Sequence, residues 1–238
     1  MKIGVLVPFT NTNIEADMIR MRPKGSSIHF TRIGGYDLNL IPDGDQMVAM
    51  GETDISEPLR LIAAVSPDVI LYGCTSATLS HGLDFDKRLK ESIATITGAF
   101  AITAAGALIE ALSALKITKI GFASPYVQNV NDLAIEFLSD AGFETVARAE
   151  SDKPLSSIEQ GALTPDNVYT LALQADSPET EAIVLSCTDL RAVEIVERLE
   201  AKTGKPVVTS NQAMMFALSR VFTEFDYGSC PGTLFKQR

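Results

Sequence analysis

Short apolar runs alternate along the chain with longer stretches in which apolar residues recur every three or four positions. The short runs are typical of buried strands, and the longer stretches of helices that pack one face against a core. The predicted strands span residues 3–7, 69–72, 119–123, 183–185 and 206–208. The predicted helices span residues 52–65, 83–93, 104–115, 130–141, 166–175, 190–203 and 212–222. This alternation predicts βαβ units, and therefore an α/β fold with mainly parallel sheets.

The two halves of the chain repeat one plan. Residues 2–11 read KIGVLVPFTN and residues 119–129 read KIGFASPYVQN, each a predicted strand followed by a proline and polar residues. The next predicted strand of each half also ends alike, with Gly73-Cys74-Thr75 in the first and Ser186-Cys187-Thr188 in the second. A duplicated half-domain explains both matches.

The repeat predicts two pseudosymmetric lobes, each a mainly parallel sheet flanked by helices. The approximate boundaries place residues 1–96 and 211–238 in the first lobe and residues 97–210 in the second. Ligands in open α/β sheets bind beyond the carboxyl ends of the strands. The active site is therefore expected in the cleft between the lobes, lined by equivalent strand ends.

Cys74 and Cys187 are the candidate catalytic residues. A lone cysteine at a strand end is more commonly a small core residue, but the repeated placement favours a pair. Backbone N–H groups and a following helix N-terminus are expected to lower the thiol pKa. The hydroxyl groups of Thr75, Ser76 and Thr188 are candidates for binding carboxylates and stabilising an enediolate. Two opposed thiols suit a reaction in which one face of a carbon loses a proton and the other gains one.

Composition excludes several other functions. A net charge of −10 disfavours nucleic-acid binding, and no apolar run is long enough for a membrane span. Three cysteines far apart form no disulfide framework, and with no signal-peptide pattern at the N-terminus they favour free thiols in the cytoplasm. No phosphate loop, dinucleotide-binding motif or zinc-ligand spacing is present, so no cofactor or metal is expected. A dyad of Cys74 with His81 is conceivable, although a surface histidine is the commoner case, and Cys230 lacks the strand-end setting.

The Cys-Thr-Ser and Ser-Cys-Thr sequences, together with Pro8 to Asn11, resemble the aspartate/glutamate racemase superfamily. Within it they are most similar to the branch of maleate cis-trans isomerase, arylmalonate decarboxylase and the ectoine-utilisation protein EutA. The resemblance extends through residues 204–212 and 227–235. It implies a cofactor-independent enzyme that is a homodimer or higher homo-oligomer.

The resemblance also implies residue roles. Cys74 matches the cysteine that attacks the double bond in maleate isomerases, and Cys187 the one that acts as acid/base. Asn11 matches an asparagine that binds a substrate carboxylate, and Tyr126 a tyrosine that lines the pocket. Both cysteines are present, which is unlike the decarboxylases, where the first position resembles a glycine.

At two positions the sequence departs from the pattern of maleate isomerases, and these departures leave the identity of the substrate undecided. Ser157 stands near the position where maleate isomerases commonly carry a second carboxylate-binding asparagine, and Asp189 where an asparagine often follows Cys-Thr. A negative charge near the pocket favours a substrate with an amino group. The sequence therefore supports an isomerase of a small dicarboxylate, with a racemase of aspartate or an ectoine-derived amino acid as the alternative and a non-catalytic binding protein as a third possibility.

Overall fold

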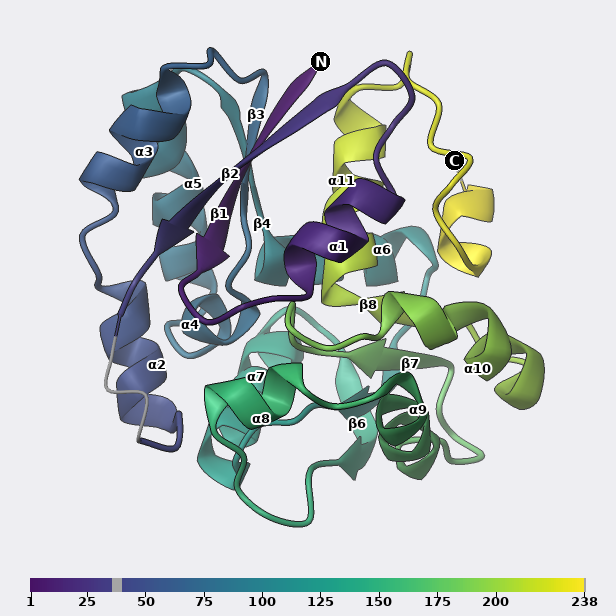
Figure 1. Ribbon diagram of the computed structural model, residues 1–238. Helices are drawn as coiled ribbons and strands as arrows, with labels where there is room; N and C mark the ends of the chain where they lie inside the picture. Colours follow the sequence, from purple (N-terminus) through teal and green to yellow (C-terminus); the bar gives the residue numbers. More distant parts are fainter. Residues whose placement is uncertain (36–39, 238) are drawn as a thin grey trace.

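The computed structural model describes residues 1–35 and 40–237, which form two four-stranded parallel sheets (Figure 1). The first sheet has the order β2-β1-β3-β4, and the second the order β6-β5-β7-β8. Their strands are β1 (Lys2–Pro8), β2 (Ser27–Ile33), β3 (Val69–Tyr72), β4 (Phe100–Thr103), β5 (Lys119–Ala123), β6 (Glu144–Ala149), β7 (Ala182–Leu185) and β8 (Val207–Thr209). The predicted α/β architecture of two parallel-sheet lobes is confirmed.

Helices cover the sheets and connect successive strands, as right-handed crossovers between parallel strands require. They are α1 (Ile14–Arg20), α2 (Gly44–Gly51), α3 (Ser56–Ala63), α4 (Thr75–Leu79), α5 (Leu83–Thr97), α6 (Ala104–Ala114), α7 (Gln128–Asp140), α8 (Ser157–Gly161), α9 (Pro165–Gln174), α10 (Val196–Thr203) and α11 (Ser210–Val221), with short 3₁₀ helices η1 (Val193–Ile195) and η2 (Thr233–Gln237). Among the described residues, no helix is both long enough and apolar enough to cross a membrane.

The apolar pattern predicts the central strands β1, β3, β5 and β7 and the edge strand β8. Strands β3 and β7 are buried at every position, because helices cover both faces of each sheet. The sequence pattern did not predict strands β2 and β6. They lie at the sheet edges, are half-buried over most of their length and mix polar with apolar residues. A partly exposed edge strand therefore lacks the continuous apolar run that identifies a central one, whereas the edge strand β8 is buried at every position.

The strand pairing corrects one detail of the lobe boundaries. Strand β4 pairs with β3 and so belongs to the first sheet, although the boundary at residue 97 had placed it in the second lobe. One buried apolar cluster includes residues of both sheets together with α6 and α11. A shared core joins the sheets, because helices α6 and α11 have apolar side chains facing both. The division into two domains itself stays a prediction.

Candidate active site

A pocket lies where the carboxyl ends of the two sheets meet. Its walls come from the ends of β1, β3, β5 and β7, with further residues from α2 and α8. The predicted site residues all line it, namely Asn11, Cys74, Thr75, Ser76, Tyr126, Cys187 and Thr188. The fold therefore gathers residues that are up to 177 positions apart in sequence, as the hydrogen bond from Asn11 to Thr188 illustrates.

Cys74 follows β3 and precedes the short helix α4. At Gly73 a Cβ atom would lie 2.4 Å from Ile14 Cδ1 and 2.8 Å from Leu6 O, so a side chain there would displace its neighbours. Cys74 itself has ordinary extended backbone angles, with φ −122°. Burial raises the pKa of its thiol, while hydrogen bonds from the Ala77 N–H and the Ser76 hydroxyl act in the opposite direction.

Cys187 follows β7 in a more constrained setting. Its φ of +153° is one that residues with a Cβ rarely adopt. The Cys187 N–H donates to Ser210 Oγ at 3.3 Å, and the Asp189 N–H lies 3.4 Å from Cys187 Sγ. Burial, reinforced by the negative charge of Asp189, raises the pKa of the Cys187 thiol to about 12, although the Tyr126 phenol and the Asp189 N–H favour the thiolate.

The expectation that the helix N-terminus lowers the thiol pKa values is wrong. Both pKa values are raised, and burial is the largest cause in each case. Helix α4 has only 5 residues, so few peptide dipoles are aligned behind Cys74. Both thiols are therefore mainly protonated at neutral pH.

The threonine hydroxyl groups next to the cysteines form hydrogen bonds between the two cysteine loops and their neighbours. Thr75 Oγ1 donates to Ser210 Oγ at 3.0 Å, so Ser210 bridges the loops of both cysteines. Thr188 Oγ1 donates to Gly73 O at 2.8 Å and accepts from Asn11 Nδ2 at 2.9 Å. The substrate-binding roles of these residues stay predictions. In this structure the hydroxyl protons of Thr75 and Thr188 point to protein acceptors.

Tyr126 lies against the pocket with 6% of its surface exposed. Its N–H donates to Ser124 Oγ at 3.1 Å, which fixes the chain after β5. Burial and the proximity of Cys187 and Cys74 hold the pKa of the Tyr126 phenol well above its ordinary value. The phenol is therefore a neutral hydrogen-bond donor beside both thiols.

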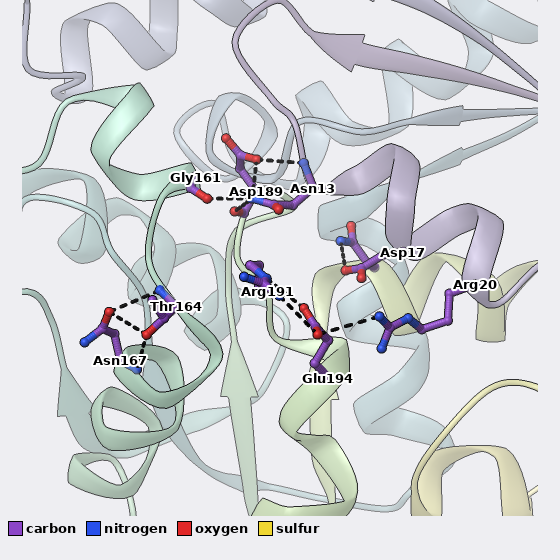
Figure 2. Close-up of polar contacts among 10 residues, drawn as sticks. Asn13, Asp17, Arg20, Gly161, Thr164, Asn167, Asp189, Arg191 and Glu194 are labelled. Carbon is purple, nitrogen blue, oxygen red and sulfur yellow. Dashed lines mark hydrogen bonds and ion pairs between the residues drawn. The ribbon is translucent and has the colours of Figure 1, made fainter.

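Asp189 connects the second lobe to the loop after β1 (Figure 2). Its Oδ1 accepts from the Thr12 N–H at 2.9 Å, the Asn13 N–H at 3.0 Å and Asn13 Nδ2 at 2.9 Å. Asn13 Nδ2 also donates to Gly161 O at 2.8 Å. Burial raises the pKa of Asp189 to about 6, although these hydrogen bonds favour the carboxylate. The sequence did not identify Thr12 and Asn13 as part of this contact, because nothing local distinguishes them.

Two other candidates lie elsewhere. The His81 Nε2 is 2.9 Å from Val48 O, and the ring stacks on Phe85 with centroids 4.1 Å apart. His81 is therefore engaged away from Cys74. Cys230 packs against the core, with its thiol 3.5 Å from Met21 O. Across the described residues, no group of three His, Cys, Asp or Glu side chains is placed to hold a metal ion.

Comparison with known proteins identifies the family. The family model described as arylmalonate decarboxylase matches residues 3–235. The chain belongs to this family. Among curated relatives, maleate isomerase of Nocardia farcinica is 29% identical over 230 residues, covering 92% of this chain and 89% of the relative. Maleate isomerase of Pseudomonas putida is 28% identical over 230 residues, covering 91% and 90%. Arylmalonate decarboxylase of Bordetella bronchiseptica is 25% identical over 224 residues, covering 89% and 86%.

Solved structures support the same fold. A cysteine-to-serine mutant of Nocardia farcinica maleate cis-trans isomerase with a covalently bound succinylcysteine intermediate matches with a TM-score of 0.87. The identity is 24%, and the match covers 100% of this chain and 98% of that one. A Pseudomonas putida maleate isomerase with maleate matches with a TM-score of 0.85 at 22% identity, covering 98% and 96%. The resemblance found in the sequence is thereby confirmed.

Proposed function

We propose that this protein is a cofactor-independent cis-trans isomerase of a small dicarboxylate such as maleate, with Cys74 as nucleophile and Cys187 as acid/base. The observation that carries the proposal is the unequal environment of two thiols in one buried pocket. At Cys74, hydrogen bonds from Ala77 and Ser76 partly offset the effect of burial on the thiol pKa, whereas at Cys187 burial and the negative charge of Asp189 together raise the thiol pKa to about 12. Maleate isomerases are among the relatives of this chain, and solved structures of maleate isomerases have the same fold.

The first half of the reaction needs a nucleophile and an acid. Cys74, which is mainly protonated in the resting pocket, reacts from the minor thiolate fraction left when its proton is lost to solvent, a fraction favoured by the hydrogen bonds from Ala77 and Ser76. This thiolate forms a C–S bond to one alkene carbon, and the alkene electron pair moves onto the carboxylate attached to the other carbon. The Cys187 thiol then protonates that second carbon, which leaves a succinyl adduct on Cys74 and a thiolate on Cys187. The neutral Tyr126 phenol stabilises the Cys187 thiolate by its hydrogen bond.

The second half reverses these steps after a rotation. The former double bond is now single, so the two carboxylates rotate apart. The Cys187 thiolate removes a proton from the carbon it protonated, the double bond re-forms and the C–S bond breaks. Fumarate leaves, and both cysteines return to their starting protonation states, so the cycle uses no oxidant, reductant or other co-reactant.

A racemase of aspartate or a related amino acid is the second candidate. The observation that favours it is the carboxylate of Asp189 in the pocket wall, with no Lys or Arg among the described residues lining the pocket. A substrate ammonium group would complement that charge. In this case the two cysteines would exchange the α-proton from opposite faces.

Proton NMR in D₂O distinguishes the candidates. We expect the maleate vinyl signal to be replaced by that of fumarate. Loss of an aspartate α-proton signal without a new alkene signal would support the racemase instead. If maleate, citraconate and both aspartate enantiomers are unchanged while one of them still binds in a calorimetric titration, the protein is a binding protein.

We also propose a cellular setting and an oligomeric state, which the substrate screen does not test. The substrate is a free small molecule, the protein works in the cytoplasm with all cysteines reduced, and it forms a homodimer or higher homo-oligomer. Support for the oligomer comes from two half-exposed apolar residues, Ile96 on α5 and Phe100 on β4, the strand at one edge of the first sheet. Light scattering of the purified protein measures the oligomeric state.

A further inference from the structure

A buried carboxylate lies outside the pocket, behind the loop that carries Cys187. Asp17 is in the middle of α1, with 4% of its surface exposed. Its Oδ2 accepts a hydrogen bond from Asn211 Nδ2 at 2.8 Å. The same Asn211 Nδ2 donates to Thr188 O at 3.0 Å. Asp17 is therefore linked through one amide group to the residue that follows Cys187.

The Cys187 loop needs such support because its backbone is strained. A φ of +153° persists in a residue with a Cβ only where the surroundings hold it. Two consecutive residues at the start of α11 do so. Ser210 accepts from the Cys187 N–H, and Asn211 donates to the Thr188 carbonyl. These hydrogen bonds hold the chain on both sides of the strained residue.

Asp17 fixes the orientation of the Asn211 amide. The Oδ1 atom of Asn211 is buried and has no hydrogen-bond partner among the described residues, so that end of the amide is not held. Turning the amide over would place Oδ1 against both the Asp17 carboxylate and the Thr188 carbonyl. The two acceptors together therefore select one orientation.

The nearby cations do not compete for this contact (Figure 2). Arg20 pairs with Glu194 at 3.6 Å, and Arg191 donates to Glu194 at 2.8 Å. Burial raises the pKa of Asp17 to about 7, with Glu194 raising it and Asn211, Arg20 and Arg191 lowering it. Because a protonated carboxyl group keeps an oxygen that accepts, Asn211 has its partner in either protonation state.

We propose that Asp17 is a positioning residue that acts through the Asn211 amide to hold Thr188 and thereby place the Cys187 thiol. The catalytic part of this inference rests on the proposed isomerase function, whereas the placement of the thiol does not. The two parts can be tested separately.

The first experiment measures thiol placement without a substrate. In a Cys74→Ser background, alkylation of Cys187 by iodoacetamide is followed by peptide mass spectrometry, which also separates Cys230. Asp17→Leu removes the acceptor, and we expect Cys187 alkylation to rise at least about threefold as the thiol leaves its buried position. Asp17→Asn keeps an acceptor oxygen and should react like the parent.

The matched control removes a buried carboxylate elsewhere. Asp86, with 5% of its surface exposed, accepts from Thr103 and pairs with Lys90, away from the pocket. Asp86→Leu should leave Cys187 alkylation unchanged. An equal rise in Asp17→Leu and Asp86→Leu would show general loosening and overturn the proposal. Should Asp17→Leu fail to fold, Asn211→Ala tests the same link, and parent-like alkylation in that variant would also overturn it.

The second experiment uses otherwise wild-type protein and maleate. We expect Asp17→Leu to lower kcat about tenfold with KM within about twofold, and Asp17→Asn to restore kcat. Unchanged kcat in a folded Asp17→Leu variant contradicts the catalytic part. If the wild-type protein does not turn over maleate, the proposed function fails, while the alkylation result still decides whether Asp17 places Cys187.

Discussion

The loops of Cys74 and Cys187 are equivalent in topology but not in physical setting. Cys74 has relaxed backbone angles at the start of α4 and receives hydrogen bonds from Ser76 and Ala77. Cys187 has a strained backbone, is held from outside by α11 and lies beside Asp189. A symmetric plan thus places two thiols in unequal settings: burial raises the pKa of both, and at Cys187 burial together with the charge of Asp189 raises the pKa to about 12.

This inequality is what a division of labour between the cysteines requires. A nucleophile reacts as its thiolate, whereas an acid must keep its proton until a carbanion forms. The hydrogen bonds to the Cys74 thiol favour the first role, and burial with the carboxylate of Asp189 beside Cys187 favours the second. Four changes test how far the comparison holds.

Replacing either cysteine by serine should have the largest effect, because it removes one of the two thiols that are compared. We expect Cys74→Ser and Cys187→Ser each to lower maleate turnover by at least about 10³-fold, because each removes a group that takes part in bond making. Cys187→Ser should still form a covalent adduct on Cys74, whereas Cys74→Ser should form none. Intact-protein mass spectrometry detects the adduct. Cys230→Ser is the control with wild-type turnover, and an adduct in Cys74→Ser would reverse the assigned roles.

The support of the Cys187 loop contains a titrating group, Asp17. Its pKa is raised from 3.8 to about 7 by burial, so the folded state binds more protons than the unfolded state between those values. The free energy of unfolding therefore falls as pH rises through this window. Asp17→Asn does not titrate, and its stability relative to wild type should increase by up to about 4 kcal/mol between pH 4 and pH 8. Urea unfolding at both pH values measures the difference, and parallel pH curves would contradict it.

Removing the bridge between the loops should affect both cysteines. Ser210→Ala deprives Thr75 Oγ1 and the Cys187 N–H of their acceptor, which should lower the free energy of unfolding by about 1–3 kcal/mol. Thr75→Val removes only the hydrogen bond from the Cys74 loop to Ser210, so the free energy of unfolding should fall by less. Thermal unfolding of the two variants provides the test. If both variants lose the same free energy of unfolding, Ser210 stabilises only the Cys74 loop.

Neutralising Asp189 should lower the pKa of the Cys187 thiol and leave that of Cys74 nearly unchanged. Asp189→Asn keeps an acceptor for Thr12 and Asn13 but removes the negative charge, so the pKa of Cys187 should fall. At pH 8 we expect alkylation of Cys187 by iodoacetamide to rise roughly threefold to tenfold. Cys74 in the same sample is the internal control and should change by less than about twofold. No change at Cys187 would show that burial alone sets its pKa.

The sequence predicted the central strands and the cysteine pair because both have local signatures. Strands β3 and β7 are continuous apolar runs, and each of the two cysteines follows such a run. The edge strands β2 and β6 have no such run, since solvent replaces packing along much of their length. The contributions of Ser210, Asn211 and Asp17 had no local signal either. Asn211 and Asp17 are 194 positions apart and meet only in the folded chain.

The sequence by itself determined the α/β class, the internal repeat and the pair of thiols at equivalent strand ends, because apolar periodicity and the order of residues are local properties. The tertiary structure decided the acidity of those thiols. A pKa reflects the sum of desolvation, charges and hydrogen bonds around one atom, and the residues that supply them are distant in sequence. Burial therefore overrode the helix N-terminus at Cys74, and burial together with the charge of Asp189 raised the pKa of Cys187 to about 12.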